Sequence, residues 1–319
     1  MLEPLVTIAC ITYNHVNYIR DAIEGFLMQK TNFPVEIRIF DDASNDGTQE
    51  ILKEYADKHK NIILFLMTEN QWSKGKYGLI DWIFPSAKGK YIALCEGDDY
   101  WTDPYKLQKQ VDFLEANPDF VICFHKVKIL KNGKLIKDNI TNVPAEITTL
   151  GDLIKYGNYI HTLSFVFRNG IINEFPKWFY KSKIGDYPLY LLLSKFGKIK
   201  SIDEIMGVYR LHHQGIHSTK PKEYYLETMI FIFESIKTME YFHKYNKRIN
   251  SRLEHFYIKK LAYSLKKLNF SEIKSLILKL FHRNLNYFRY PIVIFKIILI
   301  LFISSINYSL IKIKTIVLK

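Results

Sequence analysis

The chain has 319 residues, a length that fits one large domain or about two smaller ones. Hydrophobic residues make up 48% of it, with 22 Tyr and 22 Phe, which excludes a disordered or collagen-like chain. The formal net charge of +13 is unevenly placed. Residues 1–220 hold 27 basic and 26 acidic side chains, whereas residues 221–319 hold 18 and 6. We therefore expect two regions with different partners.

Three cysteines, Cys10, Cys95 and Cys123, are too few and too far apart for a disulfide framework or a cysteine-based zinc cluster. Cys10 and Cys95 lie in apolar runs, as expected of buried thiols in a reducing compartment. The first residues have no basic segment ahead of an apolar one, so we expect no signal peptide and a cytoplasmic location.

Apolar runs alternate with helical patterns over the first third of the chain. The runs predict strands over Val6–Ile11, Val35–Phe40, Ile62–Met67 and Tyr91–Cys95. The segments between them have the apolar spacing of helices, including a short one over Gly78–Phe84. Strands that alternate with helices in this way predict an α/β fold, with a Rossmann-like, mainly parallel sheet and helices on both faces.

The alternation ends with a helix, and residues 120–210 are less regular. The predicted elements are a helix after Pro104, a strand over Phe120–Leu130, a turn at Asn132-Gly133, a strand over His161–Arg168, a helix over Asp186–Phe196 and a strand over Ile205–Tyr209. From Pro221 onward only helices are predicted. We therefore assign residues 1–220 to the α/β domain and residues 221–319 to a basic, all-helical C-terminal region.

Polar residues follow the first two strands, at the sheet edge where ligands of such folds bind. Thr12, Tyr13 and Asn14 come after the first strand, and Asp41 and Asp42 come after the second. A carboxylate in that place can accept hydrogen bonds from a nucleobase N–H or a ribose hydroxyl. A capped turn is the alternative, because Asp, Ser and Asn also begin helices.

Three carboxylates, those of Glu96, Asp98 and Asp99, follow the fourth strand within four residues. They repel one another unless a cation neutralises them. Mn²⁺ or Mg²⁺ suits such oxygen ligands and also binds substrate phosphates. A solvated turn is the alternative, although Tyr100 and Trp101 would then place bulky rings at the surface.

Taken in order, three segments resemble family 2 glycosyltransferases of the GT-A fold. They are Thr12-Tyr13-Asn14, the run from Asp41 to Thr48 and the run from Glu96 to Gln110. The resemblance covers about residues 4–215 and is most specific between Cys95 and Leu114. It implies a UDP- or dTDP-linked sugar donor, a divalent metal and inversion at the anomeric carbon.

The resemblance also implies roles for single residues. The nucleotide sugar would contact Thr12, Tyr13, Asn14, Asp41, Asp42, Glu96, Asp98 and Arg210. The acidic element begins with Glu96 rather than Asp, which leaves open which carboxylates bind the metal; we expect Asp98 and Asp99, with His212 as a further ligand. Arg210 could instead form an ion pair that caps the core.

Asp186, just before a predicted helix, is implied as the general base on the acceptor hydroxyl, and an N-cap role is the alternative. The nearby Asp203 and Glu204 lie in a predicted polar turn and should be solvated. His161 and its neighbours could line the acceptor pocket or lie in a half-buried strand. His15 is interpreted as an ordinary residue, because nothing pairs it at ligand spacing.

Two other functions compete with sugar transfer. A nucleotidyltransferase would be expected to carry a triphosphate loop rich in Gly, Arg and Lys, and residues 12–20 contain a single Arg. An inactive, transferase-like membrane-binding protein would be expected to lack acidic site residues, and Asp42, Asp98, Asp99 and Asp186 are all present. We therefore expect a glycosyltransferase with a glycan or lipid-linked acceptor.

The C-terminal region ends in an apolar stretch. Pro291–Ile311 has one charge in 21 residues, enough length to cross ~30 Å of hydrocarbon, but four Ser and Asn residues interrupt it. No nucleic-acid-binding motif accompanies the basic residues, so we expect no nucleic acid partner. We expect a peripheral location at the inner face of the cell membrane, with the stretch lying in the interface ahead of packing on the protein or spanning the bilayer.

Overall fold

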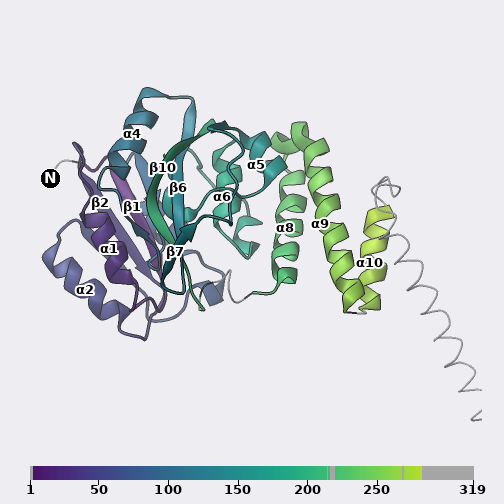
Figure 1. Ribbon diagram of the computed structural model, residues 1–319, viewed down its shortest axis with the longest axis horizontal. Helices are drawn as coiled ribbons and strands as arrows, with labels where there is room; N and C mark the ends of the chain where they lie inside the picture. Colours follow the sequence, from purple (N-terminus) through teal and green to yellow (C-terminus); the bar gives the residue numbers. More distant parts are fainter. Residues whose placement is uncertain (1–2, 214, 216–219, 268, 282–319) are drawn as a thin grey trace, which may run out of the picture. The chain divides into compact units, whose positions relative to one another are not determined.

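The computed structural model describes residues 3–213, 215, 220–267 and 269–281. The chain divides into two compact units, Met1–Lys220 and Pro221–Lys319. The first unit is built on one mixed sheet surrounded by helices (Figure 1). The α/β class predicted from the alternating pattern is therefore confirmed.

The strands of the first unit are β1 (Val6–Thr12), β2 (Val35–Asp41), β3 (Ile62–Leu66), β4 (Tyr91–Leu94), β5 (Tyr100–Trp101), β6 (Phe120–Lys131), β7 (Lys134–Lys137), β8 (Ile147–Thr148), β9 (Val166–Arg168) and β10 (Lys198–Leu211). Its α-helices are α1 (Ile19–Leu27), α2 (Thr48–Lys58), α3 (Phe84–Ser86), α4 (Lys106–Ala116), α5 (Leu150–Tyr156) and α6 (Asp186–Leu193). Shorter turns are η1 (Trp72–Lys74), η2 (Leu79–Ile83), η3 (Thr162–Ser164) and η4 (Phe179–Lys181).

The sheet has the strand order β3-β2-β1-β4-β9-β6-β10-β5, with β7 paired to β6 and β8 paired to β10. The first four strands are parallel, as their near-continuous apolar runs predict. Beyond β4 the pairing is mixed, because β9 runs antiparallel to both β4 and β6, while β6 and β10 are parallel. The parallel half brings the carboxyl ends of β1, β2 and β4 to one edge.

Two predictions in the second half of the unit are wrong. The segment from His161 to Arg168 is not one strand, because only Val166–Arg168 joins the sheet and Thr162–Ser164 forms a turn. Side chains satisfy the carbonyls of that turn: Trp101 Nε1 donates to Leu163 O at 2.7 Å, and Gln110 Nε2 donates to Ser164 O at 2.9 Å. The residues before Ile205 are not a turn either, because β10 runs from Lys198 with irregular register.

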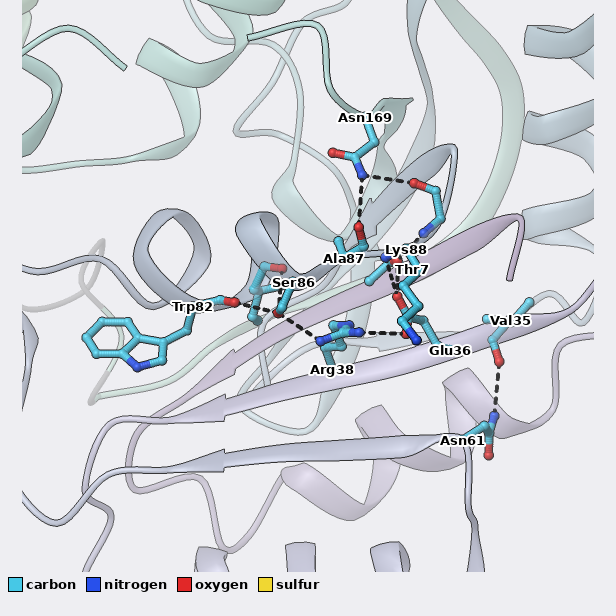
Figure 2. A network of polar contacts seen from close by, with 12 residues as sticks. Thr7, Val35, Glu36, Arg38, Asn61, Trp82, Ser86, Ala87, Lys88 and Asn169 are labelled. Carbon is cyan, nitrogen blue, oxygen red and sulfur yellow. Dashed lines mark hydrogen bonds and ion pairs between the residues drawn. The ribbon is translucent and has the colours of Figure 1, made fainter. Parts of the chain in front are cut away.

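A buried polar network joins the amino-terminal halves of β1 and β2 to the chain around α3 (Figure 2). Arg38 Nη2 donates to Glu36 Oε2 at 3.0 Å, and Thr7 Oγ1 donates to Glu36 Oε1 at 2.6 Å. Arg38 also donates to Ser86 Oγ at 2.8 Å. Burial opposes ionisation of Glu36, but these donors outweigh it and lower its pKa. The network fixes the strand ends opposite those that carry the site.

The described part of the second unit is helical, as predicted: α8 (Lys222–Lys237), η5 (Glu240–Tyr245), α9 (Asn246–Lys266) and α10 (Phe270–Phe281). Lys260 on α9 lies between two carboxylates, 3.1 Å from Glu227 Oε1 and 2.9 Å from Glu272 Oε1. Among the described residues, no helix is both long and apolar enough to cross a membrane. The apolar stretch Pro291–Ile311 lies outside the described residues.

Candidate active site

The turns after β1 and β2 hold one another in place. Register pairs Thr12 with Asp41, and beyond that pair the backbone N–H of Asn14 donates to Ser44 Oγ at 2.8 Å. Asn14 adopts φ 55° and Ala43 adopts φ 65°, left-handed conformations that let both turns reverse tightly. The predicted nucleotide-binding residues after these two strands are thus brought together at one edge of the sheet.

Asp41 and Asp42 both have protein partners. Asp41 is fully buried and accepts hydrogen bonds from the Ser44 N–H at 2.9 Å and from Gln49 Nε2 at 2.6 Å. Asp42 accepts the backbone N–H groups of Gln71 at 2.5 Å and of Trp72 at 3.2 Å. The Asp42 carboxylate therefore positions a loop that carries an exposed Trp.

Asp98 lies at the centre of the second cluster. His212 Nε2 is 2.9 Å from Asp98 Oδ2, and His15 Nε2 is 3.8 Å from the same oxygen. Arg210 Nη1 donates to the Asp98 carbonyl at 2.8 Å, and its side chain also pairs with Asp21. The turn after β4, the turn after β1 and the end of β10 therefore converge on this carboxylate.

Asp99 is placed differently from Asp98. Its side chain is buried, and its Oδ1 accepts the backbone N–H of Arg210 at 2.8 Å, while its Oδ2 has no partner among the described residues. Burial and the neighbouring Asp98 and Glu96 carboxylates raise its pKa well above the usual range. Asp99 thus ties β10 to the turn after β4.

The carboxylates of this cluster differ in the direction in which their surroundings shift the pKa. Burial, together with Asp98 and Asp186, raises the pKa of Glu96 to about 8. Burial acts in the same direction on Asp98, but the hydrogen bond to His212 and the nearby His15 outweigh it and lower its pKa. Asp98 is therefore the carboxylate that the surrounding side chains keep ionised.

Several buried polar atoms around Asp98 have no partner in the described part of the chain. They are Thr12 Oγ1, His15 Nδ1, Glu96 Oε2, Asp99 Oδ2 and His212 Nδ1. A buried polar atom without a hydrogen bond costs about 1–3 kcal/mol of folding free energy. Such a concentration at one sheet edge indicates a place that a polar ligand completes.

Asp186 is the first residue of α6, preceded by Gly185. Asn158 Nδ2 donates to its Oδ2 at 2.8 Å. Its charge contributes to the raised pKa of Glu96, so the two carboxylates are electrostatic neighbours. The contact that the structure gives the Asp186 carboxylate is therefore the one with Asn158.

The other predicted candidates fall around this cluster. His161 Nε2 lies 3.0 Å from Asp138 Oδ2, and the His161 ring is 4.9 Å from that of Tyr209. Glu204 lies 2.5 Å from Lys109 Nζ, and Asp203 pairs with Lys126. Both acidic residues are engaged with surface lysines, as their expected solvation suggests.

Sequence reasoning missed three residues at the site: His15, Trp72 and Asn158. Their partners, Asp98, Asp42 and Asp186, are all distant in the sequence. The one available signal was the position of His15, directly after the turn residues Thr12–Asn14.

Relatives of the chain are known from several organisms. It is 36% identical over 212 residues to an uncharacterized protein of Mycobacterium tuberculosis, an alignment that covers 66% of this chain and 60% of that relative. It is 31% identical to UDP-Glc:alpha-D-GlcNAc-diphosphoundecaprenol beta-1,3-glucosyltransferase WfaP of Escherichia coli, over 69% of this chain and 82% of WfaP.

Solved structures share the fold of this chain at low sequence identity. Staphylococcus aureus TarS in complex with UDP matches with a TM-score of 0.57 and 19% identity, over 81% of this chain and 72% of that one. A mannosyltransferase of Pyrobaculum calidifontis, in complex with GDP-Man and Mn²⁺, matches with a TM-score of 0.57 and 17% identity, over 94% of this chain and 86% of that one.

The family model for glycosyl transferase family 2 matches residues 7–174, which include the turns after β1, β2 and β4. That segment is more than half of the chain, and it contains the motifs that resemble this family. The family resemblance and the expected GT-A fold are therefore confirmed. The chain belongs to family 2 of the glycosyltransferases, a family of enzymes.

Proposed function

We propose that the protein transfers a sugar, with inversion, from a nucleotide-diphosphate donor to a glycan or lipid-linked acceptor. The observation that carries the proposal is the convergence of His212 and His15 on Asp98 at the sheet edge, beside the paired turns of β1 and β2. The names of two relatives of Escherichia coli, WfaP and WfgD, describe transfer of glucose to a diphosphoundecaprenol-linked sugar.

The nucleoside in this proposal lies over the carboxyl ends of β1 and β2. The residues that would contact the nucleoside are Thr12, Tyr13, Asn14, Asp41 and Asp42. Those that would lie toward the ribose and diphosphate are Glu96, Asp98 and Arg210. Two of the lone-pair directions of Asp42 are taken up by backbone N–H groups, which leaves room for a base N–H. Tyr13 and Trp72 add exposed rings, and the Trp72 N–H donates to Asp42. A UDP- or dTDP-linked sugar remains our expectation.

The side chains around Asp98 fit a divalent metal. Carboxylate and imidazole ligands suit Mn²⁺, and Mg²⁺ accepts the carboxylates, while Glu96 Oε2 and His212 Nδ1 have no partner among the described residues and so stay available to a ligand. We assign the ion to Asp98 and His212; the predicted ligand Asp99 accepts the Arg210 N–H and, within the described residues, does not form a three-ligand cluster with them. When bound, the ion would offset the negative charge that builds on the departing diphosphate.

Asp186 acts as the general base in this proposal. Inversion in one displacement requires an acceptor hydroxyl to attack the anomeric carbon opposite the leaving diphosphate and to lose its proton as it bonds. Asp186 would take that proton, and the hydrogen bond from Asn158 would hold its carboxylate in one orientation.

The C-terminal region would bring the enzyme to the inner face of the membrane. The basic residues that precede the apolar stretch are Lys259, Lys260, Lys266, Lys267, Lys274, Lys279, Arg283 and Arg289. Lys260 and Lys267 pair with carboxylates of α8 and α10, so the other residues are the candidates for membrane contact. Each basic side chain near an anionic leaflet contributes about 1 kcal/mol to binding, so a few together would suffice. A lipid-linked acceptor would be met at this surface.

Donor hydrolysis tests the proposed function without knowledge of the acceptor. The full chain is incubated with UDP-, dTDP- and GDP-linked sugars with Mn²⁺, with Mg²⁺ and with a chelator, and release of the nucleoside diphosphate is measured. We expect hydrolysis of a UDP- or dTDP-linked sugar that stops with the chelator. If no nucleotide sugar is bound or hydrolysed under any condition, the proposal is wrong.

A further inference from the structure

The hairpin of β6 and β7 is rich in lysine. Residues 126–137 contain no acidic residue, and the lysines are Lys126, Lys128, Lys131, Lys134 and Lys137. Lys126 pairs with Asp203. In the part of the chain that the structure describes, the other four lysines form no ion pair. The outer part of the hairpin, residues 128–137, is therefore a local excess of positive charge.

The same hairpin exposes apolar side chains. All four residues of β7 are exposed, with Leu135 at 52% and Ile136 at 37%. Successive strand residues point to opposite faces, so neither face of β7 is covered by another element. Lysines on an edge strand discourage pairing with other chains, but exposed aliphatic residues between them work against that purpose. Protection of an edge strand against pairing with other chains therefore does not by itself explain why lysines and exposed aliphatic residues occur together in β7.

The hairpin lies at the rim of the candidate active site. In the β6–β10 ladder, Leu130 pairs with Arg210 and Lys131 pairs with Leu211, the residue before His212. At the other end of β7, Asp138 contacts His161, whose ring packs on Tyr209. The hairpin is thus held beside the site at two places: next to its turn, by pairing with the end of β10, and just after β7, by the contact of Asp138 with His161.

We propose that residues 128–137 bind the anionic surface of a lipid bilayer and hold the active site at the level of a membrane-embedded acceptor. The lysines complement anionic headgroups, and Leu135, the more exposed of the two aliphatic side chains, suits the shallow apolar layer beneath them. The acceptor part of this inference rests on the proposed function. The surface is separate from the C-terminal region, since it lies within the first unit.

A local fluorescent label tests contact at the hairpin itself. The three native cysteines are buried, so an environment-sensitive thiol dye would react with an introduced Leu135→Cys. The matched control is Lys53→Cys on α2, which packs against β3 at the other end of the sheet. The full-length protein is mixed with vesicles of phosphatidylcholine and phosphatidylglycerol, or of phosphatidylcholine alone.

We expect a blue shift of the dye at residue 135 with the anionic vesicles only, and no shift at residue 53. Two results would overturn the proposal: protein that floats with anionic vesicles without a shift at residue 135, or protein that does not bind them. An equal shift with soluble polyphosphate would also overturn it, by assigning the hairpin to a soluble polyanion.

Charge reversal provides the second measurement. Lys131 and Lys134 face one another in the hairpin register, so the double change to Glu keeps a like-charge pair and leaves hairpin stability similar. We expect binding to anionic vesicles to weaken by about 30-fold or more, because each lysine lost removes about 1 kcal/mol and each Glu gained is repelled. The control Lys53→Glu with Lys60→Glu changes the net charge equally and should bind as the wild type does; equal weakening in both would overturn the proposal.

Donor hydrolysis separates this inference from the proposed function. The Lys131→Glu, Lys134→Glu protein should hydrolyse the nucleotide sugar at the wild-type rate in the absence of vesicles, because neither residue belongs to the donor site. If the wild type hydrolyses no donor, the proposed function fails, while the vesicle measurements still decide whether the hairpin binds membranes.

Discussion

The two acidic segments of this protein, Asp41-Asp42 after β2 and Glu96–Asp99 after β4, occupy equivalent ends of parallel strands and differ in how the protein satisfies them. Each carboxylate of the first segment accepts at least two hydrogen bonds from the chain. In the second segment, Glu96 Oε2 and Asp99 Oδ2 are buried without a partner among the described residues, and the pKa values of both groups are raised.

This difference teaches that acidic residues at a sheet edge serve two purposes that the sequence alone does not separate. The first segment builds the walls of the proposed donor site by holding its loops. The second leaves polar atoms unpaired at the centre, at a cost in stability, and such costs are typical of sites that a ligand completes. Four predictions test this comparison.

The largest effect is expected from Asp98→Asn. The change removes the charge on which His212 and His15 converge, and donor hydrolysis should fall by about 10³-fold, as for loss of a key electrostatic group. Release of nucleoside diphosphate measures it. The control is Asp119→Asn, which removes an exposed carboxylate paired with Lys198 and should leave hydrolysis unchanged. Undiminished turnover in excess chelator would contradict the metal assignment.

The next effect is expected from Asp186→Asn. Transfer to acceptor should fall by about 10²-fold or more while donor binding is retained, because only the proton acceptor is removed. Calorimetric titration of the donor and a transfer assay separate the two quantities. Asp152→Asn, in the first turn of α5, is the matched control and should not change transfer per folded molecule. Transfer at the wild-type rate would show that Asp186 is not the base, and Glu204, which is paired with Lys109, would not replace it.

A smaller effect, on stability, compares Asp41→Asn with Asp99→Asn. At position 41 the new amide would offer an N–H group where the chain supplies donors, so the free energy of unfolding should fall by about 2 kcal/mol. The folded chain holds the Asp99 proton more tightly than the unfolded chain, so the contribution of Asp99 is greatest below its ordinary pKa and declines as pH rises.

Asp99→Asn should therefore lower the free energy of unfolding little at neutral pH. The variant should also lack the decline in stability that Asp99 causes as the pH rises. Urea unfolding at about pH 5 and about pH 8 measures both variants. Equal losses of stability for the two substitutions would show that the chain supplies hydrogen bonds equally to the two acidic segments, which would contradict the difference between them.

The smallest effect concerns Lys106, a buried cation next to the second segment. Its Nζ has no hydrogen-bond partner among the described residues and lies 3.9 Å from the centre of the Trp101 ring. Burial lowers its pKa to about 7, so between that value and its ordinary pKa of 10.5 the unfolded chain binds the extra proton and stability rises with pH.

Lys106→Met should raise the free energy of unfolding by about 1 kcal/mol at neutral pH and flatten its rise toward alkaline pH. Urea unfolding as a function of pH measures this. The control is Lys109→Met on the same helix, because Lys109 is ion-paired with Asp103 and Glu204 and should gain nothing. Loss of stability in Lys106→Met would mean that the contact with Trp101 outweighs the cost of burial.

Local patterns in the sequence predicted much of this protein. Continuous apolar runs located the four parallel strands, and the polar residues after them located the site, because strand ends of a parallel sheet share an edge. Asn132-Gly133 predicted a turn, which joins β6 to the unpredicted β7, and both residues adopt the positive φ values, 50° and 74°, that a tight hairpin turn requires.

Only the tertiary structure decided which of these polar residues are satisfied and which are not. Asp42 and Asp98 have similar surroundings in the sequence. In the structure, however, Asp42 accepts the N–H groups of Gln71 and Trp72, whereas Asp98 contacts His15 and His212. The turn at Thr162–Ser164 replaced a predicted strand because Trp101 and Gln110 bind its carbonyls. Hydrogen-bond partners of this kind come from segments distant in the chain, and local propensity carries no information about them.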